Sequence, residues 1–165
     1  MITQPDRILA VEIRAGRLGY AFIETPKTLR DFGAAWFDSS VAARSRIANL
    51  LGLFQPSVLV LRGASKRYER RSRKRNAIAE IASQEARKLA IPTTRIRERA
   101  FKSYFERRAC RDKYDIACLL VGRFPEIAWR LPERPKFYEP EPRAMLYFDS
   151  IALAAAYLGL TNSND

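Results

Sequence analysis

The sequence predicts an α/β fold with a mixed five-stranded sheet and helices on both of its faces. Three apolar segments near the start, 7–13, 18–24 and 29–37, are joined by short connections, which is typical of an antiparallel meander. Two later strands, 58–61 and 93–97, are separated by a helical pattern, and such a crossover favours parallel pairing. The sheet therefore combines a three-stranded antiparallel meander with two parallel strands.

Within the meander, residues 7–13 are almost entirely apolar, as expected for a strand covered on both faces. Gly16 is the pivot of the tight turn into the second strand, and Pro26 separates the second strand from the third. The aromatic residues with apolar spacing are expected in the core. They are Phe22, Trp36, Phe37, Phe54 and Tyr157.

Helical patterns fill the remainder of the chain. Ser39 or Ser40 can cap a first helix that ends before Pro56. The apolar face expected for this helix carries Val41, Ile47, Leu50, Leu51 and Phe54. A second helix is predicted over 76–89. Its inward residues are expected to be Ile78, Ile81, Ala82, Ala86 and Leu89.

Three further helices are predicted over 100–105, 113–124 and 145–158. The segment 131–143 holds four prolines and alternating charges, which suits an extended loop. No internal repeat or linker divides the chain, so residues 1–160 are predicted to form one domain, followed by a disordered tail over 161–165.

The composition narrows the classes of function. Thirty Lys and Arg against eighteen Asp and Glu give a net charge of +12, which favours a polyanionic partner. Histidine is absent, and this excludes a Ser-His-Asp triad and a His-ligated zinc site. Any metal chemistry must then use carboxylates, which suit Mg²⁺ or Mn²⁺. Cys110 and Cys118 match no zinc or redox motif and are expected to be reduced.

The segments needed for a membrane protein or a secreted protein are not recognisable. No apolar run approaches the ~20 residues of a membrane-spanning helix. Asp6 and Arg7 interrupt the start of the chain where a signal peptide would become apolar. A cytoplasmic location without a membrane partner is the expectation.

Three local patterns lead to a family. Residues 8–21 read Ile-Leu-Ala-Val-Glu-Ile-Arg-Ala-Gly-Arg-Leu-Gly-Tyr-Ala, Phe54-Gln55-Pro56 leads into 58–61, and 148–154 reads Phe-Asp-Ser-Ile-Ala-Leu-Ala. In this order and spacing they resemble the opening hairpin, the approach to the fourth strand and the closing helix of RuvC-type Holliday junction resolvases. The resemblance extends from Arg7 to Leu158 and implies an RNase H-like fold.

The resemblance implies hydrolysis of a phosphodiester by two metal ions about 3.5–4 Å apart, held by several carboxylates. Carried onto this chain, the acid of the first strand is Glu12 and the acid of the final helix is Asp149. If the protein is active, these two residues are the expected catalytic and metal-binding residues, with Mg²⁺ or Mn²⁺ as the cofactor.

Two other acidic positions of the family are not acidic in this chain. The acid after the fourth strand corresponds to Arg62, and the acid one helical turn before Asp149 corresponds to Leu146. Glu12 is also one methylene longer than the family's Asp. Repulsion between Arg62 and a cation at ~4 Å is worth about 4 kcal/mol at an effective dielectric constant of about 20.

The acidic centre therefore looks degenerate, and we expect weakened or lost nuclease activity. Arg62 is expected to pair with Glu12 and Asp149 in an internal salt bridge. An alternative is that Glu98, Glu139 or Glu141 substitutes for the missing acids. Under that alternative the protein is an active, metal-dependent endonuclease selective for branched DNA.

The densest charge lies between Lys66 and Arg75, where seven of ten residues are basic. Such a run, with an aromatic residue for stacking and a helix start beside it, is typical of nucleic-acid contact. Together with Arg14 and Arg62, the predicted nucleic-acid-binding residues are Lys66, Arg67, Tyr68, Arg70, Arg71, Arg73, Lys74 and Arg75.

The sequence thus predicts a protein that binds branched or structured DNA through a basic surface. RNA remains an alternative partner, because phosphate contacts carry no base sequence. A third alternative is an RNA- or ribosome-associated assembly protein whose basic segment docks on its partner. The resemblance also implies a homodimer, with the helix over 76–89 as a candidate interface by analogy alone.

Overall fold

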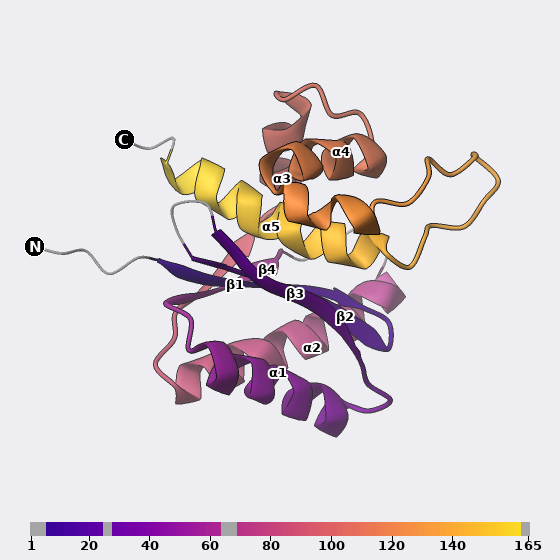
Figure 1. Ribbon diagram of the computed structural model, residues 1–165. Helices are drawn as coiled ribbons and strands as arrows, with labels where there is room; N and C mark the ends of the chain where they lie inside the picture. Colours follow the sequence, from indigo (N-terminus) through magenta and orange to yellow (C-terminus); the bar gives the residue numbers. More distant parts are fainter. Residues whose placement is uncertain (1–5, 25–27, 64–68, 163–165) are drawn as a thin grey trace, which may run out of the picture.

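A mixed sheet lies between two layers of helices in the computed structural model, which describes residues 6–24, 28–63 and 69–162 (Figure 1). The strand order is β3-β2-β1-β4-β5. Neighbours β1, β2 and β3 pair antiparallel, and β1, β4 and β5 pair parallel, which confirms the predicted sheet. The strands are β1 (Arg7–Arg14), β2 (Arg17–Glu24), β3 (Thr28–Trp36), β4 (Val58–Arg62) and β5 (Thr93–Ile96).

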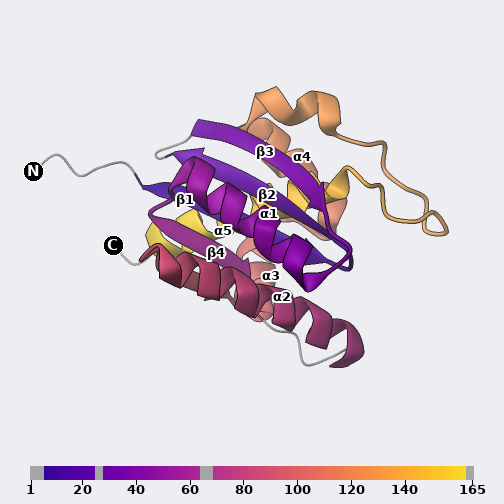
Figure 2. The ribbon, with the colours of Figure 1, turned by 90° about the horizontal axis from the view of Figure 1, so that it is seen from below.

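Two helices, α1 (Ser40–Phe54) and α2 (Glu69–Lys88), cover one face of the sheet (Figure 2). The other face is covered by α5 (Met145–Asn162), and α3 (Glu98–Glu106) and α4 (Lys113–Arg123) pack outside α5 (Figure 1). This arrangement explains the apolar run of β1. Ile8 and Ala10 belong to the core under α5, whereas Leu9 and Val11 belong to the core under α1 and α2.

From Ile151 onward, the middle of α5 is apolar on all sides, as expected for a helix between the sheet and the outer helices. Residues 151–156 are all buried. The helix continues past the predicted end at 158, and the Thr161 hydroxyl donates a hydrogen bond to the Tyr157 carbonyl at 2.8 Å. The helix thus includes the first two residues of the predicted tail over 161–165, and the rest of that segment lies outside the described residues.

Two expected core residues of the helices are exposed. The buried residues of α1 are Ala43, Ile47 and Leu51. Val41 precedes Ala43 by two residues, about 200° around the helix, so it faces solvent. Leu89 follows the last residue of α2 and is exposed in the turn after it.

The start of α2 also differs from the prediction. It lies at Glu69 rather than at Asn76, so the second half of the basic segment is helical. Arg, Lys, Glu and Ala all favour helices, and no Gly or Pro interrupts the run. Patterns of apolar spacing miss such a start because the first turns of this helix carry no apolar face.

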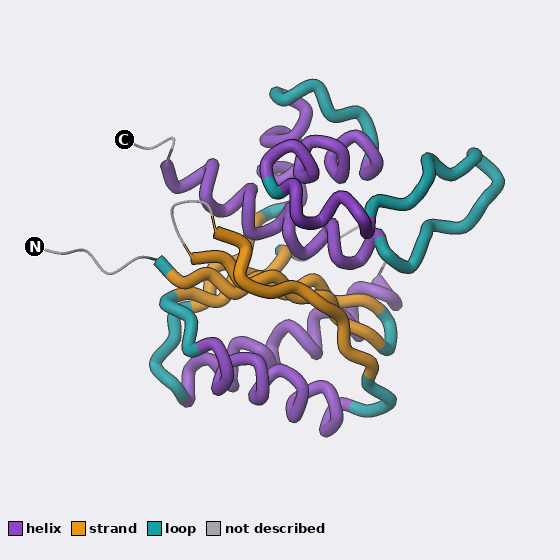
Figure 3. The backbone as a smooth tube through the Cα atoms, in the orientation of Figure 1, coloured by secondary structure: helices purple, strands orange, loops and turns teal. Residues whose placement is uncertain are grey.

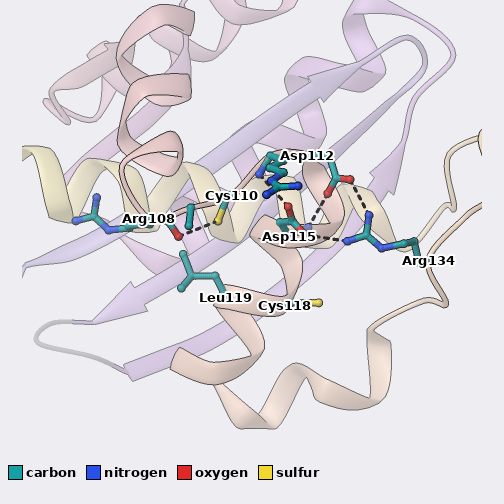
Figure 4. Close-up of a pocket in the computed structure, with 9 residues that line it drawn as sticks. Arg108, Cys110, Asp112, Asp115, Cys118, Leu119 and Arg134 are labelled. Carbon is teal, nitrogen blue, oxygen red and sulfur yellow. Dashed lines mark hydrogen bonds and ion pairs between the residues drawn. The ribbon is translucent and has the colours of Figure 1, made fainter.

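The proline-rich segment is a long loop that projects beyond the helices, as predicted (Figure 3). A short 3₁₀ helix, η1 (Pro125–Arg130), precedes it and was not predicted. The Arg134 guanidinium fastens the start of the loop to α4, because it donates to Asp112 at 2.9 Å and to Asp115 at 2.8 Å (Figure 4). Cys110 and Cys118 in this region are free thiols, the first buried and the second exposed.

None of the helices within the described ranges is long and apolar enough to cross a membrane.

Candidate functional site

The two acids predicted from the sequence lie on either side of one guanidinium. Glu12 is on β1 and Asp149 is in the second turn of α5, and both are buried, with 2% and 6% of their surface exposed. The Arg14 guanidinium donates to Glu12 Oε1 at 3.4 Å and to Asp149 Oδ2. Glu12 and Arg14 are two residues apart on a strand, so their side chains leave the same face of the sheet.

Arg62 approaches Glu12 from the neighbouring strand. It is the last residue of β4, which pairs with β1, and its Nε donates to Glu12 Oε2 at 3.1 Å. A terminal nitrogen of the same guanidinium donates to Glu98 at 2.9 Å, and the guanidinium lies 3.9 Å from the centre of the Phe101 ring. The expected pairing with Glu12 is present, but the second partner is Glu98, and Arg14 takes the contact to Asp149.

A third cation completes the cluster. Lys113, the first residue of α4, places its Nζ 3.4 Å from Asp149 Oδ2 and 2.7 Å from Glu141 Oε1. Nothing in the sequence marked Lys113, because the contact depends on how α4 packs against α5. We call Glu12, Asp149, Arg14, Arg62 and Lys113 the ionic cluster.

Burial and neighbouring charges shift the pKa values of Glu12 and Arg62 in opposite directions. Burial raises the pKa of Glu12, although the charges of Arg62 and Arg14 act to lower it. For Arg62, burial alone would lower the pKa, but Glu12 and Glu98 raise it above its ordinary value. Arg62 therefore remains a cation at neutral pH.

This donor set does not suit two divalent metal ions. Among the residues that the structure describes, no three Asp, Glu, Cys or His side chains come together in a way that could hold a metal ion. The carboxylates of Glu12 and Asp149 instead accept hydrogen bonds from guanidinium and ammonium groups. Each of these groups is a fixed positive charge within contact distance of the oxygens that a metal would need.

The acids considered as substitutes also have partners, and two of them pair with cations of the ionic cluster itself. Glu98 binds Arg62 and Glu141 binds Lys113. Glu139 accepts a hydrogen bond from the backbone of Lys136 within the projecting loop, at 3.0 Å.

A groove of about 1150 Å³ opens beside the ionic cluster. It passes the turn between β1 and β2, the start of α1 and the N-terminal half of α2. Five basic residues line it against two acidic ones, Asp38 and Glu141. The basic residues are Arg14, Arg17, Lys74, Arg75 and Lys113. We call this surface the basic groove.

The predicted nucleic-acid-binding residues divide into four groups. Three of them, Arg14, Lys74 and Arg75, line the basic groove. Arg73, which directly precedes Lys74 in α2, is exposed. Arg62 belongs to the ionic cluster. Two residues lie in the first turns of α2 with side chains outside the described part, namely Arg70 and Arg71, and three lie wholly outside it, namely Lys66, Arg67 and Tyr68. Arg17 and Lys113 also line the groove, and the sequence analysis did not single them out.

Solved structures resemble the chain over almost its whole length. Thermus thermophilus RuvC in complex with a Holliday junction substrate gives a TM-score of 0.68 at 14% identity, over 94% of this chain and 96% of that chain. RuvC alone from this organism gives 0.69 at 13% identity, with the same coverage. The yeast mitochondrial Holliday junction resolvase Ydc2 gives 0.64 at 12% identity, over 96% and 81%. No protein-family model matches the sequence, and no curated protein does.

At these identities the likeness establishes the fold. The chain has the RNase H-like α/β fold in its RuvC-type form, as the three sequence patterns predicted.

Proposed function

We propose that this protein binds branched DNA through the basic groove and does not cut it. The observation that carries the proposal is the position of Arg14. Its guanidinium joins the two acids that a nuclease of this fold would use, and the same residue lines the basic groove. The Arg14 side chain thus occupies carboxylate oxygens that a metal ion would need, and it adds a positive charge that can contact a phosphate.

Charge and fold support the binding half of the proposal. The basic groove has an excess of cations, and the net charge of +12 favours a polyanion through release of counterions. RuvC, which this chain resembles over 94% of its length, is known in complex with a Holliday junction substrate. Branched DNA is therefore the first ligand to test.

The ionic cluster supports the loss of cutting. Two-metal hydrolysis needs carboxylate oxygens that are free to bind cations about 3.5–4 Å apart. Here Glu12 and Asp149 are buried and hold side-chain cations, and the family's other two acidic positions are Arg62 and Leu146. Asp149 and Glu12 then serve to position Arg14 rather than to bind metal.

The experiment compares a labelled four-way junction with a linear duplex of the same length. Each is incubated with the full-length protein in Mg²⁺, in Mn²⁺ and in a chelator. We expect retarded, uncut junction in all three, with affinity that falls steeply as salt rises.

Three results would count against the proposal. Metal-dependent nicks in the junction that disappear in Glu12→Gln and Asp149→Asn would establish an active nuclease. Binding to structured RNA with none to the junction would favour an RNA-associated role. Equal binding to the junction and the duplex would remove the selectivity for branches.

A further inference from the structure

Trp36 is one of the largest apolar side chains of the protein, and it is exposed. The sequence pattern placed it in the core, but 60% of its surface is accessible at the end of the edge strand β3. Two hydrogen bonds hold the backbone here. Arg46 Nε donates to the Trp36 carbonyl oxygen at 3.3 Å, and the backbone N–H of the next residue, Phe37, donates to the Gly16 carbonyl oxygen at 3.0 Å. The exposed Trp36 ring is therefore attached to a backbone segment that is held in place.

Sheet register connects Trp36 to the ionic cluster. Arg14 pairs with Arg17 across β1 and β2, and Arg17 pairs with Trp36 across β2 and β3. Directly paired residues present their side chains on the same face of a sheet. The three residues therefore form one row, and Trp36 lies two strand spacings, about 10 Å, from Arg14.

Two arginines flank the ring. The Arg17 guanidinium is 5.7 Å from the centre of the Trp36 ring, and the Arg143 guanidinium, from the segment before α5, is 5.9 Å from it. Both distances are near the outer limit of a cation–π contact. Both guanidiniums lie over the ring without close contact, and 60% of the Trp36 surface remains accessible to a planar ligand.

We infer that Trp36 is a stacking platform for an unpaired DNA base, with Arg17 and Arg143 contacting the phosphates on either side of that base. The inference rests on the proposed function and adds a preference to it. An indole face accepts any base, and base–aromatic stacking is worth about 1–3 kcal/mol per base. The protein should therefore favour branch points or gaps where a base is unstacked.

The charges around Trp36 favour nucleic acid over a protein partner. Arg14 and Arg17, in the same row as Trp36, line the basic groove, and Arg143 adds a further cation near the Trp36 ring. A protein surface that covered this ring would have to be acidic, whereas a DNA strand carries a phosphate beside every base.

The test uses the full-length chain and two fluorescent duplexes of equal length, one fully paired and one with a gap of unpaired thymidines. Trp36→Ala should weaken binding to the gapped duplex by ~10-fold, the value for a stacking loss of about 1.4 kcal/mol. Binding to the paired duplex should not change, and Trp36→Phe should recover part of the loss. The matched control is Trp129→Ala, because Trp129 is also exposed, at 71%, beside Arg130.

A second measurement reads the contact directly and does not need Trp36→Ala to fold. The chain has two tryptophans, so Trp36 is the sole source of tryptophan fluorescence in Trp129→Phe. Oligothymidine should quench this emission.

The outcomes separate the two proposals. Gapped DNA that binds wild type and Trp36→Ala equally, or emission that is not quenched, would overturn the stacking role and leave the proposed function intact. Equal losses on both duplexes would also overturn it. If wild type binds neither duplex nor a four-way junction, the proposed function fails and the inference fails with it.

Discussion

Arg14 contacts two buried carboxylates at once, and it is only 19% exposed in its side chain. When a buried carboxylate loses its cation, the free energy lost by removing it from water is no longer offset by an ion pair. Arg62 and Lys113 still contact Glu12 and Asp149, respectively, so part of the compensation remains when Arg14 is removed.

Arg14→Met should therefore lower the free energy of unfolding by about 3 kcal/mol, the lower end of the range for breaking a buried ion pair. Urea denaturation at neutral pH measures this change. In the background Glu12→Gln with Asp149→Asn the same substitution should cost much less, because no uncompensated charge is left. A loss below about 1 kcal/mol in the wild-type background would mean that Arg14 does not neutralise the acids.

At this scale the sequence predicted the two acids, but it placed Arg62 between them, whereas Arg14 contacts both. Glu12 and Asp149 followed from the strand and helix patterns that carry the family resemblance. The role of Arg14 was available in principle, since residues two apart on a strand share a face. Trp36 was misplaced because alternation along β3 identifies a face of the sheet but does not show where the covering helix ends.

The contact between β2 and α5 sets the position of Asp149. Gly19 lies under Leu146, and a Cβ at Gly19 would stand 2.8 Å from both the Leu146 carbonyl oxygen and its Cγ. The backbone oxygen cannot rotate away as a side chain can. A side chain at Gly19 would therefore push the start of α5, including Asp149, away from the sheet.

Gly19→Ala is expected to lower the free energy of unfolding by about 1–3 kcal/mol through this overpacking. Thermal or urea unfolding measures it. Gly52→Ala is the matched control: Gly52 lies in α1, nothing lies within 4 Å of its added Cβ, and alanine should stabilise the helix by about 0.5–1 kcal/mol. Equal effects at the two positions would contradict the close packing of α5 on β2.

Element order was predictable because the apolar periods of strand and helix differ, and every strand of the sheet was expected near its observed place. The early start of α2 could not be predicted from apolar spacing, because its first turns carry charged residues on every side. The contact of Lys113 with Asp149 was also beyond the sequence, because it is created when α4 packs against α5.

At the scale of the whole molecule, the basic groove brings together basic side chains from β1, β2, α2 and α4. Each phosphate contact adds about 0.9 to the slope of log affinity against log salt concentration on duplex DNA. Charge that lies outside the groove should add less to this slope.

Lys74→Ala with Arg75→Ala should therefore reduce the magnitude of the salt slope for junction binding by about 2, as measured by fluorescence anisotropy over a range of salt concentrations. Arg87→Ala with Lys88→Ala removes the same charge from the other end of α2 and is the control. If both pairs reduce the slope equally, binding depends on net charge and not on the groove.

We propose that the cations of Arg14, Arg62 and Lys113 take the place of metal ions at Glu12 and Asp149. Titration of the full-length protein with Mn²⁺, with free Mn²⁺ followed by electron paramagnetic resonance, tests it most directly. We expect the curves for wild type, Asp149→Asn and Glu12→Gln with Asp149→Asn to superimpose. Saturable binding of two Mn²⁺ ions to wild type that disappears in these variants would contradict it.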